Sequence, residues 1–153
     1  MNSRFATSVD IPACIVLRGQ TREYPISAEK LAAMGITVDS WANDVSSGAL
    51  TGYVSTDEES IVGYCFGDNT SGEVLVLALL PDYENRGIGQ HLLELVVRHL
   101  TAAGHKRVFL GCAADPGTRS HGFYRHLGWV STGTFDRAGD EVLELFPSFS
   151  GEA

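Results

Sequence analysis

The stretch covering residues 73–103 limits the fold of this chain more than any other. Residues 74–80 form an unbroken apolar run that Pro81 ends, which is typical of a buried strand. From Ile88 the apolar residues recur every three or four positions, and polar residues take the other positions. This spacing predicts an amphipathic helix that ends near Ala103. A strand, a short turn and a helix therefore follow one another here.

The turn between this strand and helix contains Gly87 and Gly89. The first N–H groups of a helix have no internal partner, and the helix dipole favours a negative charge there. Glycines also let a ligand approach the backbone closely. The turn therefore predicts a site for a phosphate or pyrophosphate, with Arg86 beside it. The alternative is a simple connection that uses glycine only for its backbone freedom.

Two well-known phosphate motifs do not fit this turn. A P-loop needs Lys and then Ser or Thr after its last glycine, whereas Gln90 and His91 follow Gly89. A dinucleotide fingerprint needs a third glycine at the position of Leu92. An anion site in this turn would therefore belong to another class.

Two segments carry a resemblance to one family. Residues 84–89, Glu-Asn-Arg-Gly-Ile-Gly, resemble the acetyl-CoA-binding motif Gln/Arg-x-x-Gly-x-Gly/Ala of the GNAT superfamily of N-acetyltransferases. Residues 123–129, Phe-Tyr-Arg-His-Leu-Gly-Trp, resemble its Phe-Tyr-x-x-Leu-Gly-Phe/Trp segment. The resemblance implies an α/β fold: one GNAT-like domain over residues 1–147, whose mostly antiparallel sheet splays at its centre and is flanked by helices. The cofactor arm would enter where the sheet splays.

The rest of the chain agrees with this fold class. Strands are predicted at residues 4–7, 49–56, 60–67, 74–80, 106–112, 129–135 and 141–146, and helices at 9–18, 28–34, 37–45, 88–103 and 118–127. Ser8 and Ser27 are the predicted N-caps of the first two helices. We expect residues 148–153 to form a disordered tail.

Charge and composition limit the classes of molecule that this chain can be expected to bind. The chain has 11 Lys and Arg against 19 Asp and Glu, a net charge of −8. This argues against binding to nucleic acid or to an anionic membrane, and it is compatible with a cationic amine as substrate. We see no signal peptide, membrane span or zinc-site spacing. We therefore expect a cytoplasmic protein without a metal, whose three cysteines are buried and reduced.

The resemblance also implies a reaction, the direct transfer of an acetyl group from acetyl-CoA to a primary amine. Tyr124 would be the general acid for the leaving thiolate, because a phenol with a pKa near 10 stays protonated at neutral pH. Its alternative role is packing beside Phe123 and Leu127. Glu73 would be the general base, as in the histone-acetylating branch of the family. A water chain replaces such a base in many relatives, and Glu73 would then be a solvated residue that leaves a turn.

Cofactor contacts follow from the same resemblance. The backbone N–H groups of Leu79 and Leu80 would hold the thioester carbonyl and the pantetheine arm. The remaining cofactor-binding residues would be Asn85, Arg86, Gly87, Gly89, Gln90, Arg119 and Ser120. Glu84 departs from the usual Gln or Arg of the motif. To avoid repelling a pyrophosphate, its carboxylate would point outward or pair with Arg86.

Several functions stay open at this level. The leading one is acetylation of a small-molecule amine, followed by acetylation of a protein lysine or N-terminus. A non-catalytic acyl-CoA-binding module is favoured by Glu84 and by the absence of the Asn that the family often has after the strand ending near Cys112. An unrelated nucleotide-binding domain is more distant. Dimers are common in the family, and the last hairpin is the contact we expect for a homodimer.

Overall fold

The computed structural model describes residues 1–147, so the predicted tail lies outside the described residues. The order along the chain is β1 (Asn2–Phe5), α1 (Ile11–Arg18), α2 (Ala28–Ala33), α3 (Val38–Ser47), β2 (Leu50–Asp57), β3 (Ser60–Asp68), β4 (Val74–Leu79), α4 (Ile88–Ala102), β5 (Val108–Cys112), α5 (Arg119–His126), β6 (Val130–Phe135) and β7 (Glu141–Leu145). Two 3₁₀ turns, Ser8–Asp10 and Pro81–Tyr83, precede α1 and follow β4. Each predicted strand and helix is present, with its ends displaced by at most two residues.

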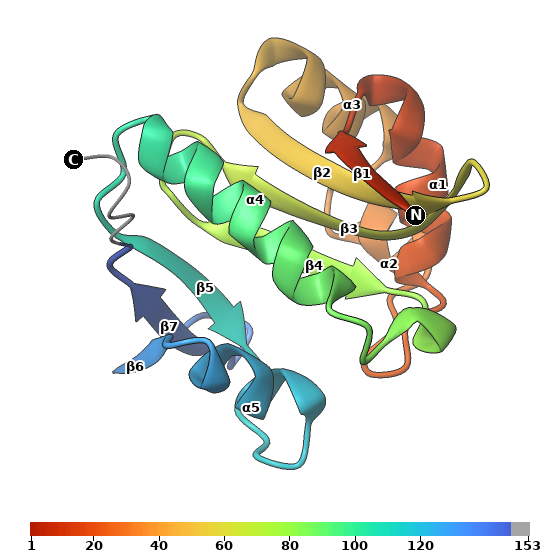
Figure 1. The fold of residues 1–153 in the computed structure, drawn as a ribbon. Coiled ribbons are helices and arrows are strands. Elements are labelled where there is room, and N and C mark those ends of the chain that lie inside the picture. Colours follow the sequence, from red (N-terminus) through yellow and green to blue (C-terminus); the bar gives the residue numbers. More distant parts are fainter. Residues whose placement is uncertain (148–153) are drawn as a thin grey trace.

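The strands form two antiparallel sheets that touch at one point. One sheet has the order β1-β2-β3-β4 and the other β5-β7-β6. Within residues 1–147, a single parallel bridge, Glu73 to Phe109, joins the start of β4 to β5, and the Phe109 N–H donates to the Gly72 carbonyl at 3.3 Å. Beyond this bridge β4 and β5 diverge (Figure 1). The predicted sheet, mostly antiparallel and splayed at its centre, is confirmed.

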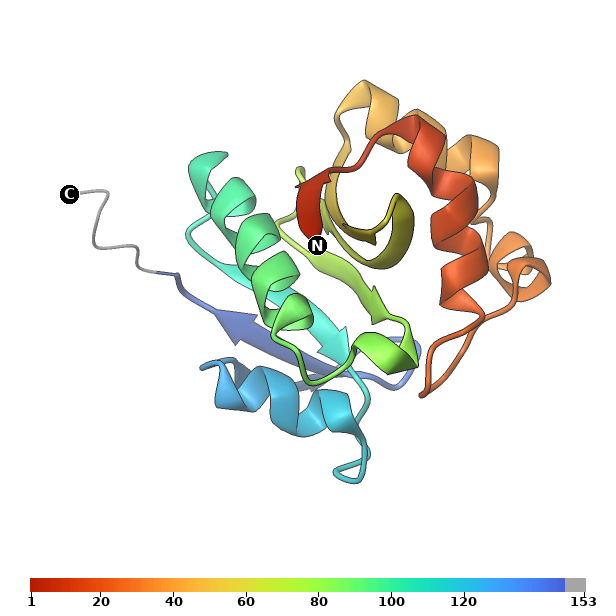
Figure 2. The ribbon, with the colours of Figure 1, turned by 45° about the vertical axis from the view of Figure 1, so that its right-hand side comes forward.

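Helices cover both faces of the first sheet. Figure 2 shows α1 and α3 on one face and α4 on the other. Leu92, Leu100 and other residues of the apolar stripe of α4 pack in one core cluster, which includes β5 and β7. Trp41 of α3 packs with Phe66 of β3 in a second cluster, with ring centroids 5.1 Å apart. The first sheet thus lies between two cores, and no further strand pairs along its edge at β4 within residues 1–147.

The entry to α1 differs from the prediction. Thr7 caps a 3₁₀ turn that leads into the helix, and Asp10, rather than Ser8, is the N-cap of α1 itself. The reason is Asp10, whose carboxylate accepts the Thr7 N–H at 2.8 Å and two bonds from Arg4 at 2.8 and 2.9 Å. The predicted cap of α2 is confirmed, because the Ser27 side chain accepts the Lys30 N–H.

Among residues 1–147, no helix combines the length and the apolar character that crossing a membrane requires.

The packing of α4 generates a stability prediction. Leu92 of this helix is fully buried, whereas Glu94, two residues further along, is exposed. Replacing Leu92 by Ala leaves a cavity and should lower the free energy of unfolding by about 3 kcal/mol. Replacing Glu94 by Ala, on the same helix, should change it by less than about 0.5 kcal/mol. Urea unfolding of both variants measures this difference, and equal losses would contradict the described core.

Candidate active site

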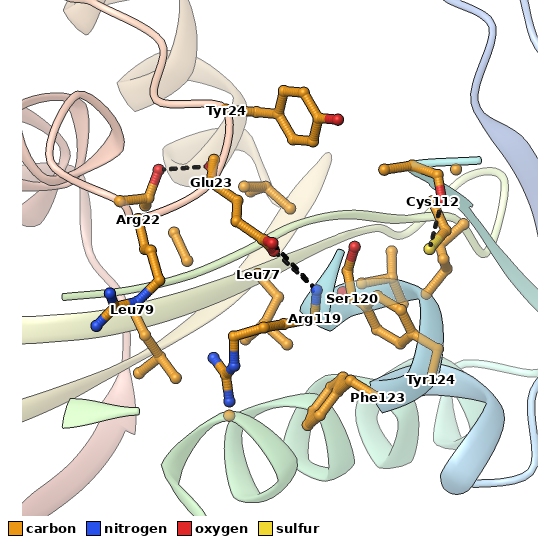
Figure 3. Close-up of a pocket in the computed structure, with 18 of the residues that line it drawn as sticks. Arg22, Glu23, Tyr24, Leu77, Leu79, Cys112, Arg119, Ser120, Phe123 and Tyr124 are labelled. Carbon is orange, nitrogen blue, oxygen red and sulfur yellow. Dashed lines mark hydrogen bonds between the residues drawn. The ribbon is translucent and has the colours of Figure 1, made fainter. Parts of the chain in front are cut away.

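A cleft of about 860 Å³ opens where β4 and β5 diverge. It is lined by β4, the end of β5, the start of α4, the first turns of α5 and the loop of residues 19–27 between α1 and α2. Figure 3 shows side chains from these segments facing one another across it. The family resemblance implies that a cofactor arm enters at this place.

The glycine turn presents free backbone donors to the cleft. Asn85 and Gly87 have left-handed φ values of 63° and 81°, and Gly87 caps α4 without help from a side chain. The first helical bond runs from the His91 N–H to the Gly87 carbonyl. Within residues 1–147 no acceptor meets the N–H groups of residues 88–90. Free donors at a helix start bind anions, so this turn is suited to a phosphate.

Gly89 is also required by packing. A Cβ atom at this position would lie 3.2 Å from the Cδ1 atom of Leu79 and 3.7 Å from the Phe123 ring. The glycine therefore lets the start of α4 approach β4 and α5 closely. The strand, the turn and both helices meet here, which fixes the free N–H groups at the wall of the cleft.

The edge of β4 supplies a second set of donors. Leu80 donates its N–H to the Val62 carbonyl at 2.9 Å, so it is not available to a cofactor as predicted. Antiparallel strands alternate in the direction of their N–H groups. Leu79 and Leu77 therefore direct theirs away from β3, toward the gap. Leu79 remains in the candidate site, and Leu77 is a residue that sequence reasoning missed.

Tyr124 lies at the inner wall of the cleft. Its side chain is 9% exposed and contacts Phe123 and Trp129 edge to face, with centroids 5.1 and 6.0 Å apart. The residue lines the cleft. Burial raises the pKa of Tyr124 far above that of an exposed phenol. The Tyr124 hydroxyl is therefore a neutral donor. The same side chain packs against its aromatic neighbours and lines the cleft.

Glu73 is placed apart from the other predicted residues. It lies at the closed end of the gap, in the bridge to Phe109, and it is not among the residues that line the cleft. Burial, together with the charges of Asp68 and Asp136, raises its pKa. Leu77 is four residues further along the strand, which corresponds to about 13 Å. A proton would have to travel from the cleft to Glu73 through water.

The carboxylate of Glu84 is neutralised in a way that the sequence does not indicate. Its oxygens pair with Arg22 Nε at 2.8 Å and with Arg119 Nη1 at 2.9 Å, and the side chain is 12% exposed. Arg86, the expected partner, instead lies over the Tyr83 ring, 4.9 Å from its centroid. Arg86 is also outside the lining of the cleft. The negative charge that Glu84 brings into the motif is thus neutralised by Arg22 and Arg119.

Arg119 connects several parts of the rim. Its guanidinium donates to the Asn85 side-chain oxygen at 2.9 Å, in addition to pairing with Glu84. Its backbone N–H donates to both carboxylate oxygens of Glu23, at 3.0 and 3.2 Å (Figure 3). The α1–α2 loop is thereby tied to the start of α5. Pairs separated by 62 and 96 residues leave no signal in a single sequence, so Arg22 and Glu23 were missed.

Asp140 is another cleft residue that the sequence did not indicate. It comes from the turn between β6 and β7 and lines the cleft. Gly111 on β5 makes room for it, because a Cβ atom there would be 2.7 Å from the Asp136 carboxylate and 3.3 Å from Asp140. Burial and the neighbouring Asp136 raise the pKa of Asp140. Only the fold brings this turn to the cleft.

The structure therefore gathers most of the predicted residues around one cleft. Those that line it are Leu79, Asn85, Gly87, Gly89, Gln90, Arg119, Ser120 and Tyr124. Leu80, Arg86 and Glu73 do not line it. All three cysteines are free and buried, as expected.

Comparisons with known proteins agree with the fold described above. Structures with the same fold include the PaiA N-acetyltransferase of Thermoplasma acidophilum in complex with coenzyme A, at 15% identity and a TM-score of 0.78, covering 96% of this chain and 100% of that one. YncA of Salmonella typhimurium with its cofactor acetyl-CoA has 15% identity and a TM-score of 0.72, covering 98% and 96%. The ribosomal-protein-S18-alanine N-acetyltransferase of Escherichia coli has 18% identity and a TM-score of 0.69, covering 99% and 97%.

A search of curated proteins returns no matching relative. The sequence profile of the acetyltransferase (GNAT) family, however, matches residues 17–129. This span begins in α1, contains the glycine turn and the whole of α5, and ends at Trp129. It covers most of the chain, and the chain therefore belongs to the GNAT family of acetyltransferases.

Proposed function

We propose that this protein transfers an acetyl group directly from acetyl-CoA to a primary amine of a small molecule. The observation that carries the proposal is the continuous cleft. It runs from the free N–H groups of the glycine turn, past the first turn of α5, to the open edge of β4 and Tyr124. Neighbours of the same fold were crystallised with coenzyme A or acetyl-CoA, which supports this cofactor.

The residues fit the groups of such a cofactor in order. The N–H groups at the start of α4 would receive the pyrophosphate, with Asn85 and Arg119 beside it. The pantetheine arm would follow the β4 edge, where the Leu77 and Leu79 N–H groups face the gap. The same donors would stabilise the oxygen of the thioester carbonyl as negative charge develops on it.

The chemistry assigned to Tyr124 is protonation of the leaving thiolate. Its raised pKa keeps the phenol protonated across the working range of the enzyme. Burial also raises the pKa values of the nearby Cys65 and Cys112 thiols, which keeps them neutral and poorly nucleophilic. These surroundings favour direct transfer of the acetyl group to the amine over an acyl-cysteine intermediate.

The acceptor side favours a small amine. The α1–α2 loop crosses the cleft, and Asp140 lines it from the turn between β6 and β7. Carboxylates attract an ammonium group.

Acetylation of a protein lysine or N-terminus is the alternative function, because one neighbour is an alanine N-acetyltransferase of a ribosomal protein. A non-catalytic module loses its main support, since Glu84 is neutralised by Arg22 and Arg119. The free cysteines fit the reducing cytoplasm, where we place the protein.

The cofactor assignment predicts selective stabilisation by CoA compounds. Thermal unfolding with CoA, acetyl-CoA, ATP and NAD tests it. A ligand at a hundred times its dissociation constant stabilises the folded state by about 2.7 kcal/mol. Only CoA and acetyl-CoA should raise the melting temperature. A shift with ATP or NAD alone would exclude this function and leave the fold unaffected.

The assigned acid predicts a loss of turnover without a loss of binding. Tyr124→Phe should lower kcat by about 10²- to 10⁴-fold, because the leaving thiolate loses its proton donor. The dissociation constant of CoA should stay within about twofold. Tyr53→Phe is the matched control, since Tyr53 lies outside the cleft, and it should change neither. Thiol release and calorimetry give the two readouts, and full activity of Tyr124→Phe would refute the assignment.

Glu73 as the general base, the role that the family resemblance implies, predicts a pH effect. A general base acts in its ionised form, so activity is lost as the pH falls through its pKa, which here lies above the ordinary 4.5. Glu73→Gln should lower kcat/KM about 10²-fold at neutral pH and remove this acidic limb. Asp140→Asn is the comparison, because Asp140 also has a raised pKa and lines the cleft. If only Asp140→Asn removes the limb, Asp140 is the base instead.

A further inference from the structure

We propose that Glu23 is an internal anion that holds the α1–α2 loop across the cleft in the free protein and is displaced when the cofactor binds. The inference rests on the proposed function and adds a conformational step to it. Cofactor binding would then compete with a contact inside the chain, and the loop that borders the acceptor side would move as a result.

Two adjacent loop residues tie the loop to two different elements. Arg22 Nε pairs with Glu84 Oε1 at 2.8 Å, next to the glycine turn. Both Glu23 oxygens accept the N–H of Arg119, at 3.0 and 3.2 Å, on the first turn of α5. The loop therefore reaches both the turn and α5, and Figure 3 shows its contact with α5 through Glu23 and Arg119.

The bond of Glu23 lies on the path assigned to the cofactor. Residues at the start of α5, Arg119, Ser120 and Phe123, line the cleft between the glycine turn and Tyr124. A CoA molecule that follows this path carries several negative charges past the same helix start. It meets a carboxylate bonded to the first N–H group there, and like charges at this distance repel.

Glu23, rather than Glu84, is the carboxylate that yields. Glu84 is 12% exposed and is held by two arginine side chains. Within residues 1–147, Glu23 has no ion pair within 4 Å, and its carboxylate is held only by the Arg119 backbone N–H. Its attachment is therefore the weaker one, because an ion pair with a bonded guanidinium resists separation more than one backbone contact does.

The neighbouring residue shows that the closed loop is held under constraint. Tyr24 has a left-handed φ of 48° and an exposed side chain, a conformation that is unfavourable for an aromatic residue. Such a backbone persists only where surrounding contacts enforce it. The Arg18 guanidinium of α1 donates to the Tyr24 carbonyl at 2.9 Å, so this conformation is held from within the loop, and the loop keeps this contact to α1 when Glu23 is released.

Calorimetric titration of CoA into wild type, E23Q, E23A and E29Q tests the inference. Glu29 is exposed on α2 and outside the cleft, so E29Q makes the same change in net charge as E23Q. At one fixed ionic strength, E23Q and E23A should bind CoA about three- to tenfold more tightly than wild type, because an internal competitor is gone. E29Q should bind within about twofold of wild type.

Hydrogen exchange of the free proteins gives a second readout that needs no ligand. The peptide covering residues 19–27 should exchange faster in E23Q than in wild type and E29Q, because the loop has lost its attachment to α5. Unchanged exchange in E23Q would overturn the inference.

The binding outcomes separate the two proposals. If wild type binds CoA and the Glu23 variants bind it equally or more weakly, the internal-anion role is refuted and the proposed function stands. If neither wild type nor any variant binds CoA, the proposed function fails, and this inference fails with it.

Discussion

The site depends on one backbone constraint, the single bridge between Glu73 and Phe109. Strands that continued to pair beyond it would consume the N–H groups of β4 and close the gap to β5. Because β4 and β5 diverge beyond the bridge, while β5 pairs with β7 only on its far edge, the β4 edge stays open over Leu77 and Leu79. An unpaired strand edge is normally a liability. Here its donors face a cleft whose walls come from α4, α5 and the α1–α2 loop.

Electrostatics at this cleft differ from those of the chain as a whole. The net charge is −8, yet Arg22 and Arg119 are held at the rim beside the free N–H groups of the glycine turn. Glu84 orients both arginines, so a residue that departs from the family's motif has a structural role. Glu23 is held at the same rim only by the Arg119 backbone N–H. A polyanionic cofactor would bind to a rim whose arginines are already paired with Glu84.

The fold and the cofactor wall were predictable because their signals are local. An apolar run ended by Pro81, glycines at a helix start and the spacing of α4 each depend on neighbours in sequence. Leu80 shows where such reasoning stops, because its N–H direction depends on the register with Val62. Leu75 shows the same, because it was expected to be buried within β4 but is 43% exposed and lines the cleft. The 3₁₀ turn capped by Thr7 depends on the Asp10 carboxylate, which accepts the Thr7 N–H. Residue spacing alone does not show this contact.

By itself, the sequence determined the order of the strands and helices, the anion-binding turn and the presence of Tyr124 in the second motif, since periodicity, turn chemistry and motif spacing are properties of short segments. Only the tertiary structure decided which partners neutralise Glu84, that Glu23 reaches α5, that Asp140 enters the cleft, and that Glu73 stands apart from it. Each of these depends on contacts between segments far apart in the chain. The positions of these residues depend on the divergence of the two sheets beyond the Glu73–Phe109 bridge. No local sequence pattern encodes that divergence.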